Sequence, residues 1–382
     1  MDKYEYLWMC IRNNHLPGDI SEGRDGKSFS YEEIFSFNEK GLVEKCCVTP
    51  GQARYIMSTK AMLEIDEKYE EFIKSGVRAI TVNDNEYPEK LRYIENRPFA
   101  LFYFGDIPEN QVHGHPAVAI IGARNCSEYG KHMAEELAGE LASKNIDIIS
   151  GMAYGIDGIA QASALLSGGK SYGILGCGVD VCYPRANHQL YCKLKVQGGI
   201  ISEYPVGAPA KPENFPLRNR IISGLSDVVI VVEAKIKSGT FITVDYALAQ
   251  GREIMVVPGR ATDPLSVGCN ALISQGASLA QSADDVIRII ESLSATHFKT
   301  KNVATDFRTR DLKEVIPKPK EKILLEREEN MVYSGLDFYS LSPEDISKAL
   351  NMDVFQVMSI LINLEMKGLI KETGKNMYVK CR

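Results

Sequence analysis

Short apolar runs alternate with longer amphipathic stretches through the middle of the chain. The clearest apolar runs are AVAIIG at residues 117–122 and VVIVV at residues 228–232, and each is followed by a glycine-containing turn. An uninterrupted run rich in β-branched residues is typical of a parallel strand that is covered on both faces. Strands that alternate in this way with helices predict an α/β fold with a mainly parallel sheet.

The alternation extends in both directions from these two runs. Further strands are expected at residues 146–149, before Gly176, in GGIISEYP and at residues 253–259, with helices at residues 266–274 and 284–293. Upstream, residues 1–75 favour helices, and residues 52–74 have the spacing of one longer helix that ends at Gly76. A short strand, a turn and the apolar segment FALFYF then lead into the α/β domain.

The carboxyl-terminal part of the chain changes character. Residues 296–320 are polar, basic and rich in proline, which is typical of a linker. Residues 321–382 predict a helix at 321–330, a second helix capped by Ser342, a third from Val354 to Lys367 and a short hairpin, which together indicate a winged helix. The third helix carries no Lys or Arg before Lys367. We therefore expect it to contact a protein or simply to pack within the unit, and not to read duplex DNA.

Composition and charge limit the range of partners. The chain has 382 residues, a net charge of -6 and nine cysteines without metal-ligand spacing. Binding to a nucleic acid must therefore come from a local patch of Lys and Arg. No apolar run approaches the length of a membrane span, and the acidic amino terminus does not resemble a signal peptide. We expect a cytoplasmic protein with reduced thiols, no metal and no membrane association.

Two groups of residues around the VVIVV run are suited to binding anions. Arg218, Asn219 and Arg220 precede it, and the two guanidinium groups suit bidentate contacts with phosphates. Lys237 follows the run, at the edge of the sheet where ligands of open α/β folds bind.

The turn after the same run is built from KSGT. Gly239 permits a tight turn, while the hydroxyl groups of Ser238 and Thr240 and the first N–H groups of the next helix can bind phosphate oxygens. A solvated loop before a capped helix explains KSGT alone about as well. The neighbouring arginines favour the anion site.

Other loops at this edge carry weaker candidates. Arg124, in the turn after AVAIIG, could face the crevice, but GARNCSEYG lacks the full GxGxxG pattern, so no dinucleotide cofactor is expected. Asp157 fits a helix cap better than a catalytic acid. Tyr183 and Arg185 are candidates for a base and a phosphate, or for packing a turn. Cys177 is a weak candidate nucleophile, because no His lies near it in sequence.

The assembled motifs closely resemble the DprA/Smf family of DNA-processing proteins. They run in family order from Ile120 to Ala277: IIGARNCSEYG, SGMAYGIDGIAQASAL, GILGCGVDVCYP, IISEYP, FPLRNRIISGLS, VEAKIKSGTFIT, AQGREIMVVPG and GCNALISQGA. Two departures stand out, since members commonly have Arg and His where this chain has Tyr154 and Gln161. Tyr154 could instead stack on a base.

The resemblance implies a fold and a division into domains. These are a small helical, SAM-like domain at residues 1–75, an extended Rossmann-like DNA-binding domain at 76–295, the basic linker at 296–320 and a winged-helix domain at 321–382. It further implies a homodimer that binds single-stranded DNA without nucleotide hydrolysis or a cofactor and loads the recombinase RecA during natural transformation. The implied DNA contacts are Arg124, Phe215, Arg218, Asn219, Arg220 and Lys237 to Thr240.

Two other functions remain open from the residues. An enzyme of the phosphoribohydrolase type shares a Rossmann-like sheet, but its PGGxGTxxE motif supplies a carboxylate where this chain has SGTFITVDYA, with Asp245 as a substitute that a helix would more simply place in solvent. An adaptor that acts mainly through the winged helix and the basic linker is the weaker alternative.

Overall fold

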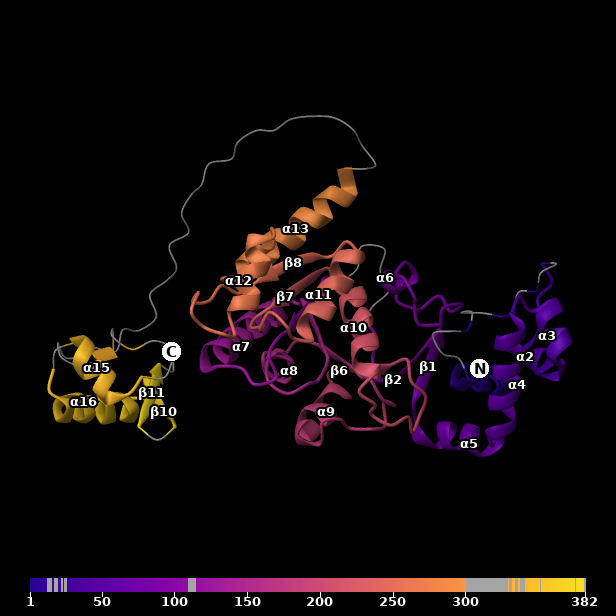
Figure 1. Cartoon of the computed structure of the whole chain (residues 1–382), viewed down its shortest axis with the longest axis horizontal. Helices are drawn as coiled ribbons and strands as arrows, with labels where there is room; N and C mark the ends of the chain where they lie inside the picture. The colour runs from indigo at the N-terminus through magenta and orange to yellow at the C-terminus, as the bar shows by residue number, and fades with distance from the viewer. Residues whose placement is uncertain are drawn as a thin grey trace. The chain divides into compact units, whose positions relative to one another are not determined.

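The fold is described from a computed structural model of the chain. It describes residues 1–299, except 12–15, 17–19, 22, 24–25 and 109–114, and residues 329–380, except 330–331, 334–335, 337–340, 351 and 375. The chain divides into two compact units, Met1–Cys126 with Met133–Glu291, and Ser127–His132 with Ser292–Arg382. Figure 1 shows the elements of each unit in chain order.

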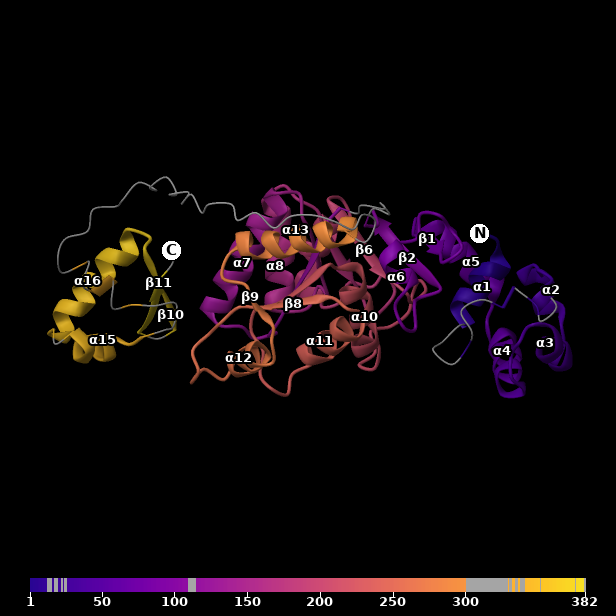
Figure 2. The ribbon, with the colours of Figure 1, turned by 90° about the horizontal axis from the view of Figure 1, so that it is seen from above.

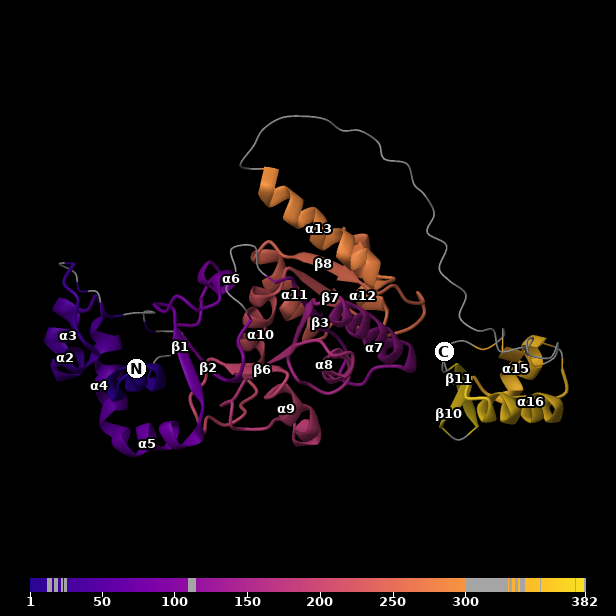
Figure 3. The same ribbon diagram turned by 180° about the vertical axis from the view of Figure 1, so that it is seen from behind.

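The first unit contains a nine-stranded sheet in the order β1-β2-β6-β5-β4-β3-β7-β8-β9. All neighbours from β6 to β9 are parallel, whereas β2 runs antiparallel to both β1 and β6. This confirms the predicted, mainly parallel α/β sheet. Figure 3 shows β1, β2 and β6 side by side at one edge. The strands are β1 (Arg78–Thr81), β2 (Ala100–Gly105), β3 (Ala117–Ile121), β4 (Asp147–Ser150), β5 (Ser171–Ile174), β6 (Gly198–Ser202), β7 (Val228–Val231), β8 (Glu253–Val256) and β9 (Ser278–Leu279).

Helices cover both faces of the sheet, which explains why β3 and β7 are buried along their whole length. Figure 2 shows α7, α8 and α13 on one face and α10, α11 and α12 on the other. The helices are α7 (Glu128–Ser143), α8 (Ile156–Leu166), α9 (His188–Leu194), α10 (Asn214–Leu225), α11 (Thr240–Ala249), α12 (Val267–Ser274) and α13 (Ala283–Lys299).

The order of the strands creates a switch point between β3 and β7. After β3 the chain moves to β4, β5 and β6, then crosses back to β7 on the other side of β3 and continues to β8 and β9. Connections on the two sides therefore leave the sheet toward opposite faces. In open α/β sheets a crevice forms at this point, beyond the carboxyl ends of the strands.

Among the described residues, five helices precede the sheet: α1 (Lys3–Ile11), α2 (Tyr31–Ser36), α3 (Glu39–Lys45), α4 (Pro50–Met62) and α5 (Ile65–Ser75). The prediction of one helix over residues 52–74 is wrong, because the backbone is extended at Leu63. The buried residues Ile56 and Phe72 explain the break, since a single straight helix would turn them about 160° apart. Gly76 ends α5 in the left-handed conformation, as predicted.

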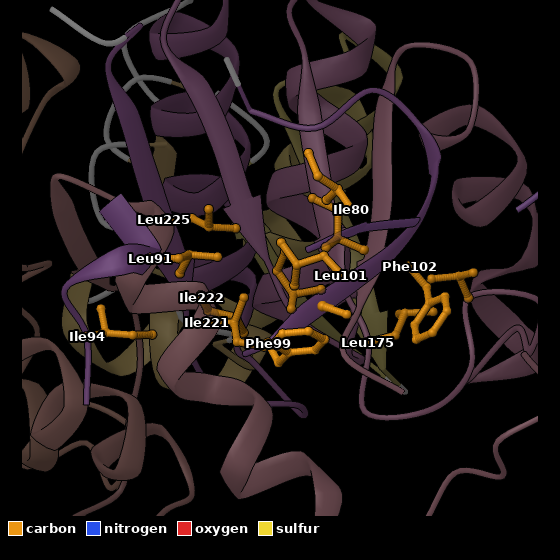
Figure 4. Close-up of a cluster of buried hydrophobic side chains, with 14 of the residues drawn as sticks. Ile80, Leu91, Ile94, Phe99, Leu101, Phe102, Leu175, Ile221, Ile222 and Leu225 are labelled. Atoms are coloured by element: carbon orange, nitrogen blue, oxygen red, sulfur yellow. The ribbon is translucent and has the colours of Figure 1, made fainter. Parts of the chain in front are cut away.

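The amino-terminal helices share a hydrophobic core with the antiparallel edge of the sheet. Tyr6 of α1 stacks on Phe72 of α5 at 4.7 Å, and both rings lie 6.1 Å from Phe102 of β2. The same core continues through β1, helix α6 (Glu89–Arg92) and α10. Figure 4 shows part of it, with labelled side chains from β1 (Ile80), α6 (Leu91), β2 (Leu101) and α10 (Ile222).

The second unit holds a compact group of helices and a hairpin. It contains α15 (Pro343–Leu350), α16 (Val354–Met366), β10 (Ile370–Gly374) and β11 (Met377–Lys380), in the order expected of a winged helix. The Ser342 hydroxyl accepts a hydrogen bond from the Asp345 N–H at 3.1 Å, which confirms the predicted cap. Most of the predicted linker at 296–320 and of the helix at 321–330 lies outside the described residues. Within the described part of the chain, no helix has the length and apolar character that crossing a membrane requires.

Candidate nucleic-acid interface

A pocket of about 580 Å³ lies at the switch point, beyond the carboxyl ends of β3 and β7. Its wall combines the turn after β3, the loop after β4, the start of α10 and the start of α11. Most of the predicted contact residues belong to this wall: Arg124, Phe215, Arg218, Asn219, Ser238, Gly239 and Thr240. Lys237 and Arg220 do not.

Arg124 supplies an exposed cation at the mouth of the pocket. No hydrogen bond or ion pair to another described residue holds its guanidinium group. The loops behind it are packed closely: the Ile156 N–H donates to the Ala123 carbonyl at 3.2 Å, and a Cβ atom on Gly155 would lie 2.2 Å from the same oxygen. Gly155 also has a φ of 71°, which favours glycine. The backbone under Arg124 is therefore fixed while its side chain is available to a ligand.

Arg218 lines the same pocket but is only 5% exposed. Its Nη1 donates to the carbonyls of Gly151, at 2.9 Å, and Ile174, which follow β4 and end β5. A Cβ atom on Gly151 would lie 2.8 Å from both Arg218 Nη2 and Asp157 Oδ2, so the two charged groups are neighbours. Burial lowers the pKa of Arg218 to about 10. Arg218 thus fixes the ends of two strands and adds positive charge to the pocket wall.

Arg220 requires a correction. It is 3% exposed, and its Nη1 and Nη2 bind the two carboxylate oxygens of Glu203 at 2.7 and 2.6 Å, while Nε donates to the Asn96 carbonyl. Residues two apart on a helix point in nearly opposite directions, so Arg220 faces away from the side chain of Arg218. The prediction that both guanidinium groups meet the same phosphates is therefore wrong, because Arg220 is buried in an ion pair.

An aromatic pair forms one side of the pocket. The rings of Tyr183 and Phe215 lie 5.3 Å apart at an angle of 32°, and Tyr183 is 47% exposed. Phe215 packs over Gly176, where a Cβ atom would come within 3.0 Å of the ring. Asn214 holds the start of α10 in place by donating to the Gly176 carbonyl at 3.0 Å. The sequence indicated each ring separately, but not that they form a pair.

The start of α11 closes the other side. Gly239 precedes the helix, and no side chain caps its first N–H groups. The Ser238 hydroxyl is buried without a hydrogen-bond partner among the described residues, while Lys237 is exposed just outside the wall. A helix start carries partial positive charge, which favours an anion such as phosphate.

The two positions that depart from the family pattern differ in role. Tyr154 is 50% exposed in the loop after β4. Gln161 is fully buried: its Oε1 accepts from the Met152 N–H at 3.0 Å and its Nε2 donates to the Ser171 hydroxyl at 3.3 Å. Gln161 therefore supports the loop from below, whereas Tyr154 is open to a ligand.

The candidate catalytic groups are poorly placed for chemistry. Burial raises the pKa of the Cys177 thiol to about 11, and Cys177 is 1% exposed. Burial also raises the pKa of Asp157, whose Oδ2 accepts from the Gly151 N–H at 3.1 Å. Asp245 is exposed on α11 and is not part of the pocket wall. Among the residues that line the pocket, Asp157 is the only acid.

The winged-helix unit shows a different surface. Helix α16, from Val354 to Met366, contains neither Lys nor Arg, and its exposed side chains include Phe355 at 82% and Met366 at 83%. This surface lacks the cations that contacts with duplex phosphates require.

Together these features define a doubly wound α/β protein with a crevice whose lining is suited to anions, followed by a winged-helix unit. Comparison with known sequences identifies the family: the model of DNA recombination-mediator protein A matches residues 78–291, and the chain belongs to that family. The model of the DprA winged helix domain matches residues 317–374. The DprA/Smf resemblance and the predicted fold class are confirmed.

Curated relatives agree with this assignment. DNA processing protein DprA of Streptococcus pneumoniae is 39% identical over 213 residues, which cover 56% of this chain and 74% of the relative. DprA of Bacillus subtilis is also 39% identical, over 56% of this chain and 71% of the relative. Protein Smf of Escherichia coli is 38% identical and covers 56% of each chain.

Solved structures also include members of the family. The X-ray structure of S. pneumoniae DprA has a TM-score of 0.63 and 32% identity, and the match covers 75% of this chain and 98% of that one. A structure of DNA processing protein A from Helicobacter pylori, described with a single-stranded DNA binding mode, has a TM-score of 0.48 and 29% identity over 59% and 97% of the two chains.

Proposed function

We propose that this protein binds single-stranded DNA in the crevice at the β3/β7 switch point and loads RecA onto the bound strand during natural transformation or homologous recombination. One observation carries the proposal: the exposed guanidinium of Arg124 shares a pocket with the Tyr183–Phe215 aromatic pair and the uncapped start of α11. Cations beside aromatic rings are the combination by which proteins hold single strands.

Each part of the pocket has a role in this binding. Arg124 and the start of α11 attract phosphates, and Lys237 extends the positive surface beyond the wall. Tyr183 offers a half-exposed ring on which a base can stack. The pocket volume of about 580 Å³ suits a nucleotide, and stacking on a ring needs an unpaired base. These features favour a single strand over a duplex.

The same geometry supports a binding protein and not an enzyme. A phosphoribohydrolase needs a carboxylate that reaches the sugar, yet the only acid in the wall is Asp157, which is buried beside Arg218. The exposed Asp245 lies outside the wall, and the Cys177 thiol is buried and protonated at neutral pH. Incubation with nucleoside monophosphates should therefore release no free base.

The wider setting follows from the family. We propose a cytoplasmic homodimer of four parts, at residues 1–75, 76–295, 296–320 and 321–382, that works with RecA and without a cofactor. Helix α16 has exposed apolar side chains and no Lys or Arg, which favours a role other than the reading of duplex DNA for the winged-helix part.

A binding experiment tests the proposal. Fluorescence anisotropy would compare single- and double-stranded oligonucleotides of the same sequence, with wild-type protein and Arg124→Ala. We expect tighter binding of the single strand, and weaker binding of that strand by the variant. RecA filament growth on the single strand, with and without the protein, then tests loading. Equal affinity for both forms of DNA would contradict the proposal.

A further inference from the structure

A second pocket, of about 500 Å³, lies farther along the same edge of the sheet, toward β8. It shares Ala123, Arg124 and Ser238 with the first pocket. Its remaining wall comes from the turn after β3 and from the loops after β7 and β8: Asn125, Ala234, Lys235, Asp263, Pro264 and Leu265. Arg124 thus stands between two neighbouring hollows.

The floor of this second pocket is fixed by backbone hydrogen bonds. The Ala234 N–H donates to the Leu265 carbonyl at 2.8 Å, and the Gly268 N–H donates to the Ala234 carbonyl at 2.9 Å. A Cβ atom on Gly268 would lie 2.4 Å from that carbonyl oxygen, so only glycine permits the contact. The loops after β7 and β8 therefore hold each other in place, and the pocket is formed before any ligand binds.

The chemistry of the wall differs from that of the first pocket. Ala234, Pro264 and Leu265 give it apolar surface, while the exposed Lys235 and Arg124 stand at its rim. Apolar walls with cations at the rim suit a base whose phosphates remain outside.

One acid distinguishes this wall. Asp263 is half-buried, and its Oδ1 accepts from the Leu265 N–H at 2.9 Å, which fixes the carboxylate. Among the described residues no hydrogen bond engages its Oδ2. A carboxylate accepts hydrogen bonds but cannot donate them, so this group selects for a ligand with a donor.

We propose that the second pocket holds a base next to the one in the first pocket, and that Asp263 selects bases with an exocyclic amine over thymine. The inference rests on the proposed binding of single-stranded DNA. Cytosine, adenine and guanine can donate an amine hydrogen to the carboxylate. Thymine has no amine, and its N3–H lies between two carbonyl oxygens that repel the acid. The bound strand then crosses the edge of the sheet with Arg124 between two successive bases.

The test compares oligo-dC with oligo-dT of about 12 nucleotides, a length within the range of known single-strand sites. Anisotropy should show wild-type protein binding oligo-dC about fivefold more tightly. In Asp263→Asn, the side-chain oxygen still accepts the hydrogen bond from the Leu265 N–H, and the preference for oligo-dC over oligo-dT should disappear. The matched control is Asp245→Asn, which removes the same charge from exposed α11 outside both walls and should retain the full preference.

A change in the ligand gives a second test that needs no variant. Oligo-dC with N4,N4-dimethylcytosine has no amine hydrogens, so it should bind wild-type protein no better than oligo-dT. Equal wild-type affinity for oligo-dC and oligo-dT, or a preference that survives either Asp263→Asn or dimethylation, overturns the inference. If Arg124→Ala still weakens the binding of both oligonucleotides, the proposed function stands without the selection of bases by Asp263. If wild-type protein binds neither, both fall together.

Discussion

Arg220 and Glu203 form a bidentate ion pair that joins α10 to the segment after β6. The Nη1–Oε1 and Nη2–Oε2 distances are 2.7 and 2.6 Å, and the two side chains are only 4% and 9% exposed. The pair anchors the helix whose first two turns carry Phe215 and Arg218 into the pocket wall. One arginine of the FPLRNR motif therefore holds the scaffold, while another lies at the site.

Breaking this pair should destabilise the fold. Arg220→Ala leaves the Glu203 carboxylate buried and unpaired, so the free energy of unfolding should fall by about 3–5 kcal/mol. Urea denaturation followed by circular dichroism measures the loss. The double variant Arg220→Met with Glu203→Leu should recover most of it, because apolar residues of similar size can replace a buried pair. Weakened DNA binding in a fully stable Arg220→Ala protein would instead favour a direct contact.

Removing Arg124 should weaken DNA binding through its charge alone. Arg124 is exposed, so Arg124→Ala should leave the melting temperature unchanged. The slope of log affinity against log salt should become shallower by about 0.7, which corresponds to one phosphate contact on a single strand. Lys40→Ala is the control, because Lys40 is an exposed cation on α3, outside both pockets. An equal effect from both variants would point to general charge attraction.

Tyr183 should contribute by stacking and not by charge. Tyr183→Ala should cost about 1–3 kcal/mol of binding free energy, the range for one base on an aromatic ring. Tyr183→Phe, which keeps the ring, should bind as tightly as wild type. The salt dependence should be the same in all three proteins, and a shallower slope in Tyr183→Ala would contradict a stacking role.

The buried Cys177 predicts a pH effect on stability. Burial raises its pKa from 9.0 to about 11 in the folded state. Between these values the folded state holds more protons than the unfolded state, so stability falls as pH rises from about 9 to 11. The loss should reach about 2–3 kcal/mol and be absent from Cys177→Ala. Parallel stability curves for the two proteins across this window would contradict the burial effect.

Removal of the winged-helix unit should leave single-strand binding intact. A chain of residues 1–295 keeps both pockets and all of the proposed contacts. Helix α16, which this shorter chain lacks, contains no Lys or Arg. The affinity of the shorter chain for a single strand should match that of the full chain, and Arg124→Ala should weaken both equally. A large loss on truncation would revive the adaptor alternative.

Local patterns were enough to predict the sheet and its crevice. The β-branched runs at β3 and β7, the glycine that ends α5 and the Ser342 cap all act within a few residues. They need no knowledge of distant parts of the chain. The wall of the first pocket follows from them, because parallel strands bring their carboxyl ends to one edge.

The errors and omissions concern contacts between distant segments. Nothing near Arg220 in the sequence shows that its partner is Glu203, and nothing near Tyr183 shows that its ring meets Phe215. The break at Leu63 depends on where the core lies, which the spacing of residues 52–74 alone does not reveal. Asp263 joins the second pocket only because the loops after β7 and β8 are bonded together.

The contact of Phe102 with Tyr6 and Phe72 sets how short a stable version of this protein can be. The family match begins at residue 78, a natural place to cut when a DNA-binding fragment is wanted. Such a cut would strip two aromatic rings from Phe102 and expose apolar surface beside β2. The part of the chain that defines the family is therefore smaller than the part that shares its hydrophobic core, and a stable fragment should also include helices α1 to α5.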